Sequence, residues 1–311
     1  MEDYTLLDVP SAWEQIPVSG LRGTIMVIGA PDVGKSTFAH YLFRRLKYEI
    51  EPDRETLQTQ KPLQAKDGRI AYLDGDPGQG ELGPPTTMTL CFNFPAVGHL
   101  PRVEDVRRYS IGSTSPRGHM LPMLVGAFRL IQFAFEAGSR CLVYDTSGLI
   151  DPSQGGQALK QAKVELLQPV VLIAIQREKE LEPILMPLRR SRRVKLIVLE
   201  PSQAVSRRDG SRRQNHRRDQ FARYFAPAHS LVVEWKNTAV FPLPRFTLNR
   251  LVALEDAAGF TLGLGIVTQI DRLNKRVTLQ TPLPDLKGVN ALRLGDIALD
   301  PHSFREIKLG S

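Results

Sequence analysis

A glycine-rich loop between an apolar run and an amphipathic run is the feature that most constrains the fold of this 311-residue chain. The run TIMVIG at 24–29 ends in glycine, and the segment GAPDVGKS that shares this glycine follows the pattern G-x-x-x-x-G-K-[ST] of phosphate-binding loops. In the next stretch, Phe38, Tyr41, Leu42 and Leu46 share one helical face. A strand, a glycine loop and a helix in this order predict a nucleotide-binding α/β domain.

Each residue type in this loop has a physical role in holding phosphate. Glycines let backbone N–H groups turn toward the phosphate oxygens, and the start of the following helix adds a favourable dipole. We expect Lys35 to reach the β- and γ-phosphates of a nucleotide, and Ser36 to bind Mg²⁺ through its hydroxyl oxygen. The predicted nucleotide-binding residues are Gly29, Ala30, Pro31, Asp32, Val33, Gly34, Lys35, Ser36 and Thr37.

Apolar runs alternate with amphipathic runs over most of the remaining chain. Residues 120–138 and 154–168 have helical patterns. The strand-like runs are RIAYLD (69–74), CLVYD (141–145), VVLIAI (170–175) and VKLIVL (194–199). This alternation predicts an α/β fold of the P-loop NTPase type, with a mostly parallel sheet and helices on both faces.

The pattern changes after Phe225 to short alternating runs with glycine and asparagine turns, which are typical of antiparallel strands. We therefore expect a P-loop domain at residues 1–227 and a small β-rich C-terminal domain at 228–311.

Composition excludes several classes of protein. With 42% hydrophobic and 24% charged residues, the chain is neither collagen-like, disordered nor a disulfide scaffold. No apolar run reaches the ~18 residues that span a bilayer, and the N-terminus lacks the layout of a signal peptide, so no membrane partner is expected. Cys91 and Cys141 lie in apolar runs and resemble buried thiols, which favours a reducing, cytoplasmic location.

The formal net charge of +8 is concentrated in one window. Between Arg189 and Arg223, twelve Arg or Lys residues oppose three acids, which leaves a charge of −1 for the rest of the chain. A basic segment on a near-neutral body indicates either a polyanionic partner or a solvated arginine-rich face. Charge alone does not decide between the two.

Two acidic turns compete for the metal or general-base role. Asp74 ends the run RIAYLD, and Asp76 follows it ahead of Gln79, at the edge of the predicted sheet where ligands bind in open α/β folds. Asp145 follows CLVY in an equivalent arrangement. Phosphoryl transfer needs such a carboxylate to orient or deprotonate the acceptor, but periodicity does not choose between these positions.

Two further segments can contact phosphate. GSTSPRGH at 112–119 combines hydroxyls with Arg117 and His119, although serine and glycine also form plain turns. A helix from about residue 211 would place Arg213 and Arg217 on one face, either as a lid over phosphate or as a solvated surface.

Together these motifs resemble the polynucleotide 5′-hydroxyl kinase family, which includes P-loop kinases of tRNA splicing, mRNA 3′-end cleavage and pre-rRNA processing, in its compact prokaryotic form. The resemblance is carried by GAPDVGKST (29–37), DGDPGQGELGPPTTMTL (74–90), GSTSP (112–116), DTSG (145–148) and the basic segment ending RYF (223–225).

The resemblance implies roles for particular residues. Asp76 is the expected general base and a metal ligand beside Ser36, and Gln79 helps order the site. A lid at about 205–225 is expected to supply Arg213 and Arg217, which with Lys35 stabilise the transferring phosphoryl group. The expected substrate-binding residues are Gln79, Ser113, Thr114, Arg117, Thr146, Gly148 and Leu149, where Leu149 stands in place of the tryptophan of the family's T-x-G-W clasp.

The implied activity is Mg²⁺-assisted transfer of the γ-phosphate of ATP or GTP to the 5′-hydroxyl of a nucleic acid, with RNA favoured over DNA. Two alternatives stay open at this stage. One is a regulatory P-loop ATPase or GTPase switch, although no N-K-x-D guanine motif stands at the expected place. The other is a nucleotide-binding scaffold in an RNA-processing complex. Protein partners are not predicted.

Overall fold

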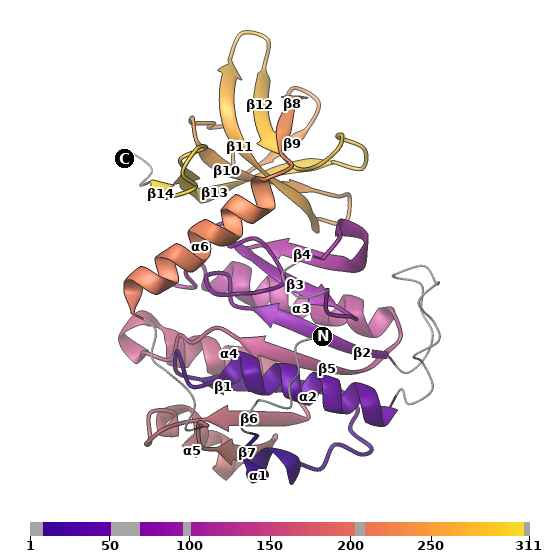
Figure 1. Cartoon of the computed structure of the whole chain (residues 1–311), viewed down its shortest axis with the longest axis vertical. Helices are drawn as coiled ribbons and strands as arrows, with labels where there is room; N and C mark the ends of the chain where they lie inside the picture. Colours follow the sequence, from indigo (N-terminus) through magenta and orange to yellow (C-terminus); the bar gives the residue numbers. More distant parts are fainter. Residues whose placement is uncertain (1–8, 51–68, 96–100, 203–208, 308–311) are drawn as a thin grey trace. The chain divides into compact units, whose positions relative to one another are not determined.

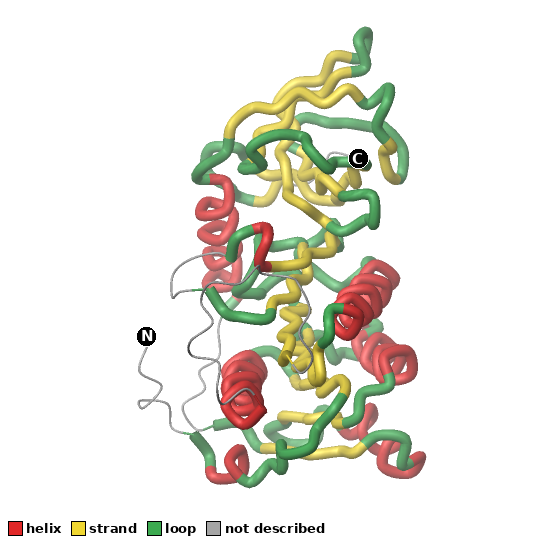
Figure 2. Tube along the Cα trace, turned by 90° about the vertical axis from the view of Figure 1, so that its right-hand side faces the viewer, coloured by secondary structure: helices red, strands yellow, loops and turns green. Residues whose placement is uncertain are grey.

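The computed structural model describes residues 9–50, 69–95, 101–202 and 209–307 (Figures 1 and 2). The chain forms two compact units. The first comprises Met1–Asp76, Leu90–Val106 and Met123–Arg208, and the second comprises Pro77–Thr89, Arg107–Pro122 and Asp209–Ser311. The chain therefore passes between the units several times, and the second unit is assembled from three separate segments.

The first sheet has the hydrogen-bonded order β4-β3-β2-β5-β1-β6-β7. Its strands are β1 (Gly23–Gly29), β2 (Arg69–Gly75), β3 (Thr87–Cys91), β4 (Val106–Ser110), β5 (Ser139–Thr146), β6 (Val171–Ile175) and β7 (Lys195–Leu199). The run β2-β5-β1-β6-β7 is parallel throughout. Its central strands β1, β5 and β6 are almost entirely buried, as a sheet covered on both faces requires.

The helices of this part of the chain are α1 (Ser11–Glu14), α2 (Lys35–Ile50), α3 (Met120–Glu136), α4 (Gly156–Leu167) and α5 (Glu182–Ser191), with short 3-10 turns η2 (Val103–Asp105) and η3 (Pro152–Gln154). Figure 2 shows α2 on one face of the sheet and α3 and α4 on the other. The predicted α/β fold with helices on both faces is confirmed. Cys91 and Cys141 are free and buried, as the sequence predicted.

The second unit contains α6 (Gly210–Phe225) and a largely antiparallel sheet of order β14-β13-β10-β11-β12-β8, with β9 pairing to β13. The strands are β8 (His229–Glu234), β9 (Ala239–Phe241), β10 (Arg250–Glu255), β11 (Thr261–Asp271), β12 (Arg276–Thr281), β13 (Ala291–Leu299) and β14 (Glu306–Ile307). The predicted β-rich C-terminal part is confirmed, with a core that includes Val252, Val267 and Leu279. The boundary at 227/228 stays a prediction.

Helix α6 begins where the sequence predicted it, near residue 211. The side chain of Asp209 accepts a hydrogen bond from the backbone N–H of Arg212 at 2.7 Å, which caps the helix. Residues 205–208, the beginning of the expected lid with Arg207 and Arg208, lie outside the described residues. The described part of the lid begins at Asp209, which caps α6. Within the described part of the chain, no helix combines the length and apolar character needed to cross a membrane.

Candidate active site

The glycine loop turns sharply between β1 and α2. Asp32 and Gly34 have positive φ angles of 54° and 85°, so the backbone N–H groups between them turn away from the regular strand direction. The guanidinium of Arg177 donates to the carbonyl oxygen of Asp32. The side chain of Lys35 is 8% exposed, and its Nζ donates to the carbonyl oxygen of Ala30 at 2.7 Å. The ammonium group of Lys35 is thus held against the backbone of the loop, and its positive charge suits phosphate binding.

The carboxylates of the first acidic turn lie at the end of β2. Asp74 is buried within the strand, opposite Asp145 of β5 in register, whereas Asp76 directly follows the strand and is half-buried. The backbone N–H of Asp76 faces Oδ1 of Asp74 at 3.4 Å. An added Cβ at Gly75 would lie 2.3 Å from the ring of Tyr144, so only glycine lets β2 approach β5 this closely. The accessible carboxylate of this turn is therefore that of Asp76.

Asp145 lies beneath the glycine loop. Its side chain is buried, its Oδ2 accepts from the hydroxyl of Tyr72 at 3.4 Å, and Ser36 is near enough to lower its pKa. Burial raises the pKa of Asp145, while the charge of Lys35 and the nearby Ser36 oppose that rise and the negative charge of Asp76 adds to it. Oδ1 of Asp145 is buried with no hydrogen-bond partner among the described residues. Asp145 is thus within electrostatic reach of both Lys35 and Asp76.

The segment predicted as a clasp packs on the glycine loop. An added Cβ at Gly148 would lie 2.9 Å from backbone atoms of Pro31, so the two loops touch through their backbones. Thr146 is buried, and its hydroxyl donates to the carbonyl oxygen of Val27 at 2.7 Å. The hydroxyl of Thr146 is therefore engaged inside the sheet, and the half-buried Leu149 follows beyond it.

Two buried lysines of α4 were missed by sequence reasoning. Lys160 donates to the hydroxyl of Thr146 at 2.7 Å and to the carbonyl oxygen of Ser147 at 2.5 Å. Burial lowers the pKa of Lys160 far below its ordinary value, and it lowers the pKa of Lys163 to about 7. A lysine in an amphipathic helix is ordinarily expected at the solvent face, so no local signal marked these two.

The other predicted substrate and lid residues belong to the second unit. Nε2 of Gln79 faces the carbonyl oxygen of Arg213 at 3.4 Å, which joins the segment after β2 to α6. On the same helix, Nε of Arg217 donates to Oε1 of Glu306 at 2.5 Å. Oε2 of Glu306 accepts from the hydroxyl of Thr114 at 3.3 Å. The structure thus gathers Gln79, Thr114 and both arginines around α6.

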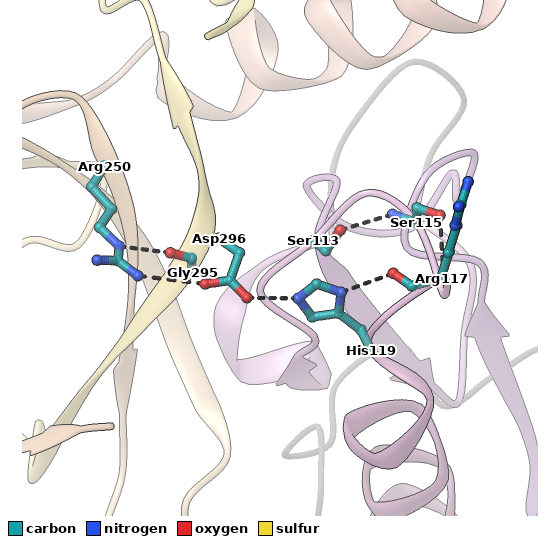
Figure 3. A network of polar contacts seen from close by, with 7 residues as sticks. All are labelled: Ser113, Ser115, Arg117, His119, Arg250, Gly295 and Asp296. Carbon is teal, nitrogen blue, oxygen red and sulfur yellow. Dashed lines mark hydrogen bonds and ion pairs between the residues drawn. The ribbon is translucent and has the colours of Figure 1, made fainter. Parts of the chain in front are cut away.

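The segment after β4 forms two consecutive hydroxyl turns, seen in Figure 3. The hydroxyl of Ser113 accepts from the backbone N–H of Ser115, and the hydroxyl of Ser115 accepts from that of Arg117, both at 3.2 Å. Ser113 is buried, whereas the side chain of Arg117 is exposed and extends away from these contacts in Figure 3. We call residues 112–119 the acceptor loop, after the prediction that Ser113, Thr114 and Arg117 bind the substrate.

Curated proteins similar to this chain share one name. Curated relatives named polyribonucleotide 5′-hydroxyl-kinase occur in Pyrococcus abyssi, with 25% identity over 93% of this chain and 92% of the relative, and in Methanocaldococcus jannaschii, with 25% identity over 89% and 87%. A relative of the same name in Pyrococcus horikoshii is 29% identical over 67% of this chain and 52% of its own length.

A similar fold is found in Clp1p, solved in complex with Pcf11p. The TM-score is 0.63 at 12% identity, over 92% of this chain and 77% of Clp1p. The family model described as the P-loop of the mRNA cleavage and polyadenylation factor CLP1 matches residues 59–227, more than half of the chain. The predicted family resemblance is confirmed: the chain belongs to the CLP1 P-loop family.

Proposed function

We propose that this protein is a polynucleotide 5′-hydroxyl kinase that transfers the γ-phosphate of ATP or GTP to the 5′ end of RNA. The names of its curated relatives support a 5′-hydroxyl kinase acting on RNA. The observation that carries the proposal is the strand arrangement in the first unit. Asp76 follows Gly75, which pairs with Thr146 of β5, and β5 also pairs with β1, the strand that leads into the glycine loop. A half-buried carboxylate after β2 can accept the proton of an acceptor hydroxyl. It therefore favours a kinase over a regulatory ATPase or GTPase.

In the proposed reaction, Asp76 accepts the proton of the 5′-hydroxyl as that oxygen bonds to the γ-phosphorus. The bond between the γ-phosphorus and the bridging oxygen breaks, and the nucleoside diphosphate leaves with that electron pair. Lys35 neutralises charge on the phosphates throughout. Phosphoryl transfer requires mainly positioning and charge neutralisation. In this proposal Asp76 orients the acceptor hydroxyl, and Lys35 neutralises charge.

The residues around Ser36 fit a magnesium ion. Mg²⁺ keeps several waters and takes few protein oxygens, and the buried Oδ1 of Asp145, which has no hydrogen-bond partner among the described residues, lies in a side chain near Ser36. When bound, Mg²⁺ neutralises charge on the phosphate oxygens. Ser36 and Asp76 are the proposed ligands, and Asp145 is a further oxygen donor of the same group.

In the second unit, we propose that Gln79, Ser113, Thr114 and Arg117 bind the acceptor strand. Arg213 and Arg217 of α6 would neutralise charge on the transferring group, a role that contributes about 10³-fold or more in P-loop enzymes. In the first unit, Gly148 and Leu149 would support the terminal nucleotide by packing, since leucine offers no ring for base stacking. Thr146 would shape this clasp from within the sheet, because its hydroxyl is already bonded.

The test is phosphate transfer from γ-labelled ATP to RNA and DNA oligonucleotides of one sequence. We expect label on 5′-hydroxyl RNA, and none on the same RNA carrying a 5′-phosphate. The variant Lys35→Ala should lose transfer, which excludes a contaminating kinase. Release of inorganic phosphate without labelled oligonucleotide would instead identify a regulatory ATPase, and repeating the assay with GTP decides the donor.

A second candidate function is a scaffold that binds nucleotide and a protein partner. It is favoured by the similarity of fold to Clp1p, which was solved in a complex with Pcf11p. Nucleotide binding without hydrolysis or transfer, in the presence of every oligonucleotide of the panel, would support this reading over the kinase.

A further inference from the structure

The acceptor loop is attached to the C-terminal sheet through its backbone. The N–H of Asp296, in β13, donates to the carbonyl oxygen of Gly112 at 2.7 Å. An added Cβ at Gly295 would lie 3.2 Å from that same carbonyl oxygen, so the strand and the loop approach closely at a glycine. Gly112 has a φ of 77°, which turns the chain from β4 into the loop. All these residues belong to the second unit.

His119 ties the other end of the loop to the same strand (Figure 3). Nε2 of His119 lies 2.9 Å from Oδ2 of Asp296, and Nδ1 lies 3.2 Å from the carbonyl oxygen of Arg117. Both ring nitrogens therefore face oxygen acceptors, and an N–H at either position donates to the oxygen that it faces. The imidazole links the backbone of Arg117, a proposed substrate residue, to a carboxylate of the C-terminal sheet.

Arg250 contacts the carboxylate of Asp296 on the side opposite His119. Its Nε donates to the carbonyl oxygen of Gly295 at 2.7 Å, and one terminal nitrogen lies 3.4 Å from Oδ1 of Asp296. The side chain of Arg250 is 16% exposed, so its position is fixed by packing, whereas that of Asp296 is 63% exposed. Figure 3 shows Asp296 between Arg250 and His119. An exposed carboxylate is thus held in one orientation toward the loop.

We propose that Asp296 and His119 are positioning residues through which the C-terminal sheet sets the conformation of the acceptor loop for binding the 5′ end of a nucleic acid. The proposal rests on the proposed kinase function. It assigns to the C-terminal domain a part in acceptor binding, although none of its residues need touch the reacting atoms. Nucleotide binding belongs to the glycine loop of the first unit and is independent of this contact.

The test is a comparison of kinetic constants in the full-length chain. Asp296→Ala should raise the KM for a 5′-hydroxyl RNA about twofold to fivefold, the range expected for an exposed ion pair, and leave the KM for ATP unchanged. Asp296→Asn should recover most of this loss because its amide oxygen still accepts from His119. His119→Gln should resemble Asp296→Ala, and the double variant should be no worse than either single variant.

Glu234→Ala is the matched control. Glu234 pairs with Arg276 across β8 and β12 of the same sheet, and both side chains are about half exposed, so its loss removes a comparable ion pair that does not involve the loop. We expect no change in either KM. An equal rise in the KM for RNA in this control would overturn the proposal in favour of general loosening of the sheet.

Hydrogen exchange supplies a readout that does not depend on activity. The backbone amides of residues 113–119 should exchange faster in Asp296→Ala than in the wild-type chain, whereas those of α2 should not. If the wild-type chain transfers phosphate and the variants keep its KM for RNA, the positioning role of Asp296 and His119 is wrong and the kinase function is supported. If the wild-type chain transfers none, the kinase falls, and unchanged exchange would then also exclude the anchoring.

Discussion

The Nζ of Lys163 lies 2.5 Å from the phenolic oxygen of Tyr144, and both side chains are completely buried beneath the carboxyl end of β5. Burial lowers the pKa of Lys163 to about 7, partly opposed by the charge of Asp76. Burial likewise raises the pKa of Tyr144 well above its ordinary value. The protein interior around this pair therefore disfavours the charged form of both groups.

This penalty predicts that the wild-type chain gains stability between pH 7 and about pH 8.5. Above pH 7 the folded chain loses the proton of Lys163, while the unfolded chain keeps it up to the ordinary pKa of 10.5, so the free energy of unfolding rises with pH. Below about pH 8.5 the thiols do not yet titrate in the unfolded chain. Urea unfolding at several pH values should show a shallower rise for Lys163→Met, whereas Lys195→Met, at an exposed position of β7, should keep the wild-type slope.

The contact between Arg217 and Glu306 predicts an effect on the rate of transfer. Both side chains are about one-quarter exposed, so solvent screens the pair only in part. Glu306→Ala should lower kcat about threefold to tenfold because Arg217 loses its orientation. Since Glu306 would act through Arg217, the double variant should match Arg217→Ala alone. A higher kcat in Glu306→Ala would show instead that the carboxylate restrains the arginine.

Asp76→Asn should separate transfer from nucleotide binding. The amide cannot accept the proton of the 5′-hydroxyl, so transfer should fall about 100-fold or more. The affinity for ATP without magnesium, measured by calorimetry, should change little, because Lys35 and the glycine loop are untouched. Glu165→Gln, which neutralises an exposed carboxylate on α4, serves as the control. Retained transfer in Asp76→Asn would show that another residue is the general base, and Asp145 would be the next candidate.

Gly148→Ala should weaken nucleotide binding. The new methyl group would press on the backbone of Pro31, which is not free to yield, and overpacking of this kind costs about 1–3 kcal/mol. We expect the Kd for ATP to rise about tenfold. Gly210→Ala adds the same methyl group in open space at the start of α6, and it should bind ATP normally. Equal affinities in the two variants would contradict close packing of the clasp on the loop.

Local patterns predicted a large part of this structure. The glycine loop, the strand and the helix on either side of it, and the helix with Arg213 and Arg217 follow from hydrophobic periodicity and turn chemistry, because those signals lie within a few residues of each other. The competing position of Asp145 was also visible, since an acid follows its apolar run. These features depend on short-range geometry.

The groups that hold the site together could not be predicted in this way. The contacts of Lys160 with Thr146, of Glu306 with Thr114 and of Asp296 with His119 depend on strand order and register, and the last two join positions more than 170 residues apart. Nothing in the sequence around His119 or Glu306 marks a partner. Their roles appear only when the sheets are assembled.

The three-segment construction of the second unit has a consequence for biosynthesis. Residues 77–89 and 107–122 leave the ribosome long before the C-terminal strands that complete their surroundings. At translation rates of roughly 5–20 residues per second, these segments wait on the order of ten seconds or more for their neighbours. The strands beside the glycine loop, β5 and β6, are complete by residue 175. A nascent chain can therefore assemble the proposed phosphate-binding loop before it makes the C-terminal surroundings of residues 77–89 and 107–122.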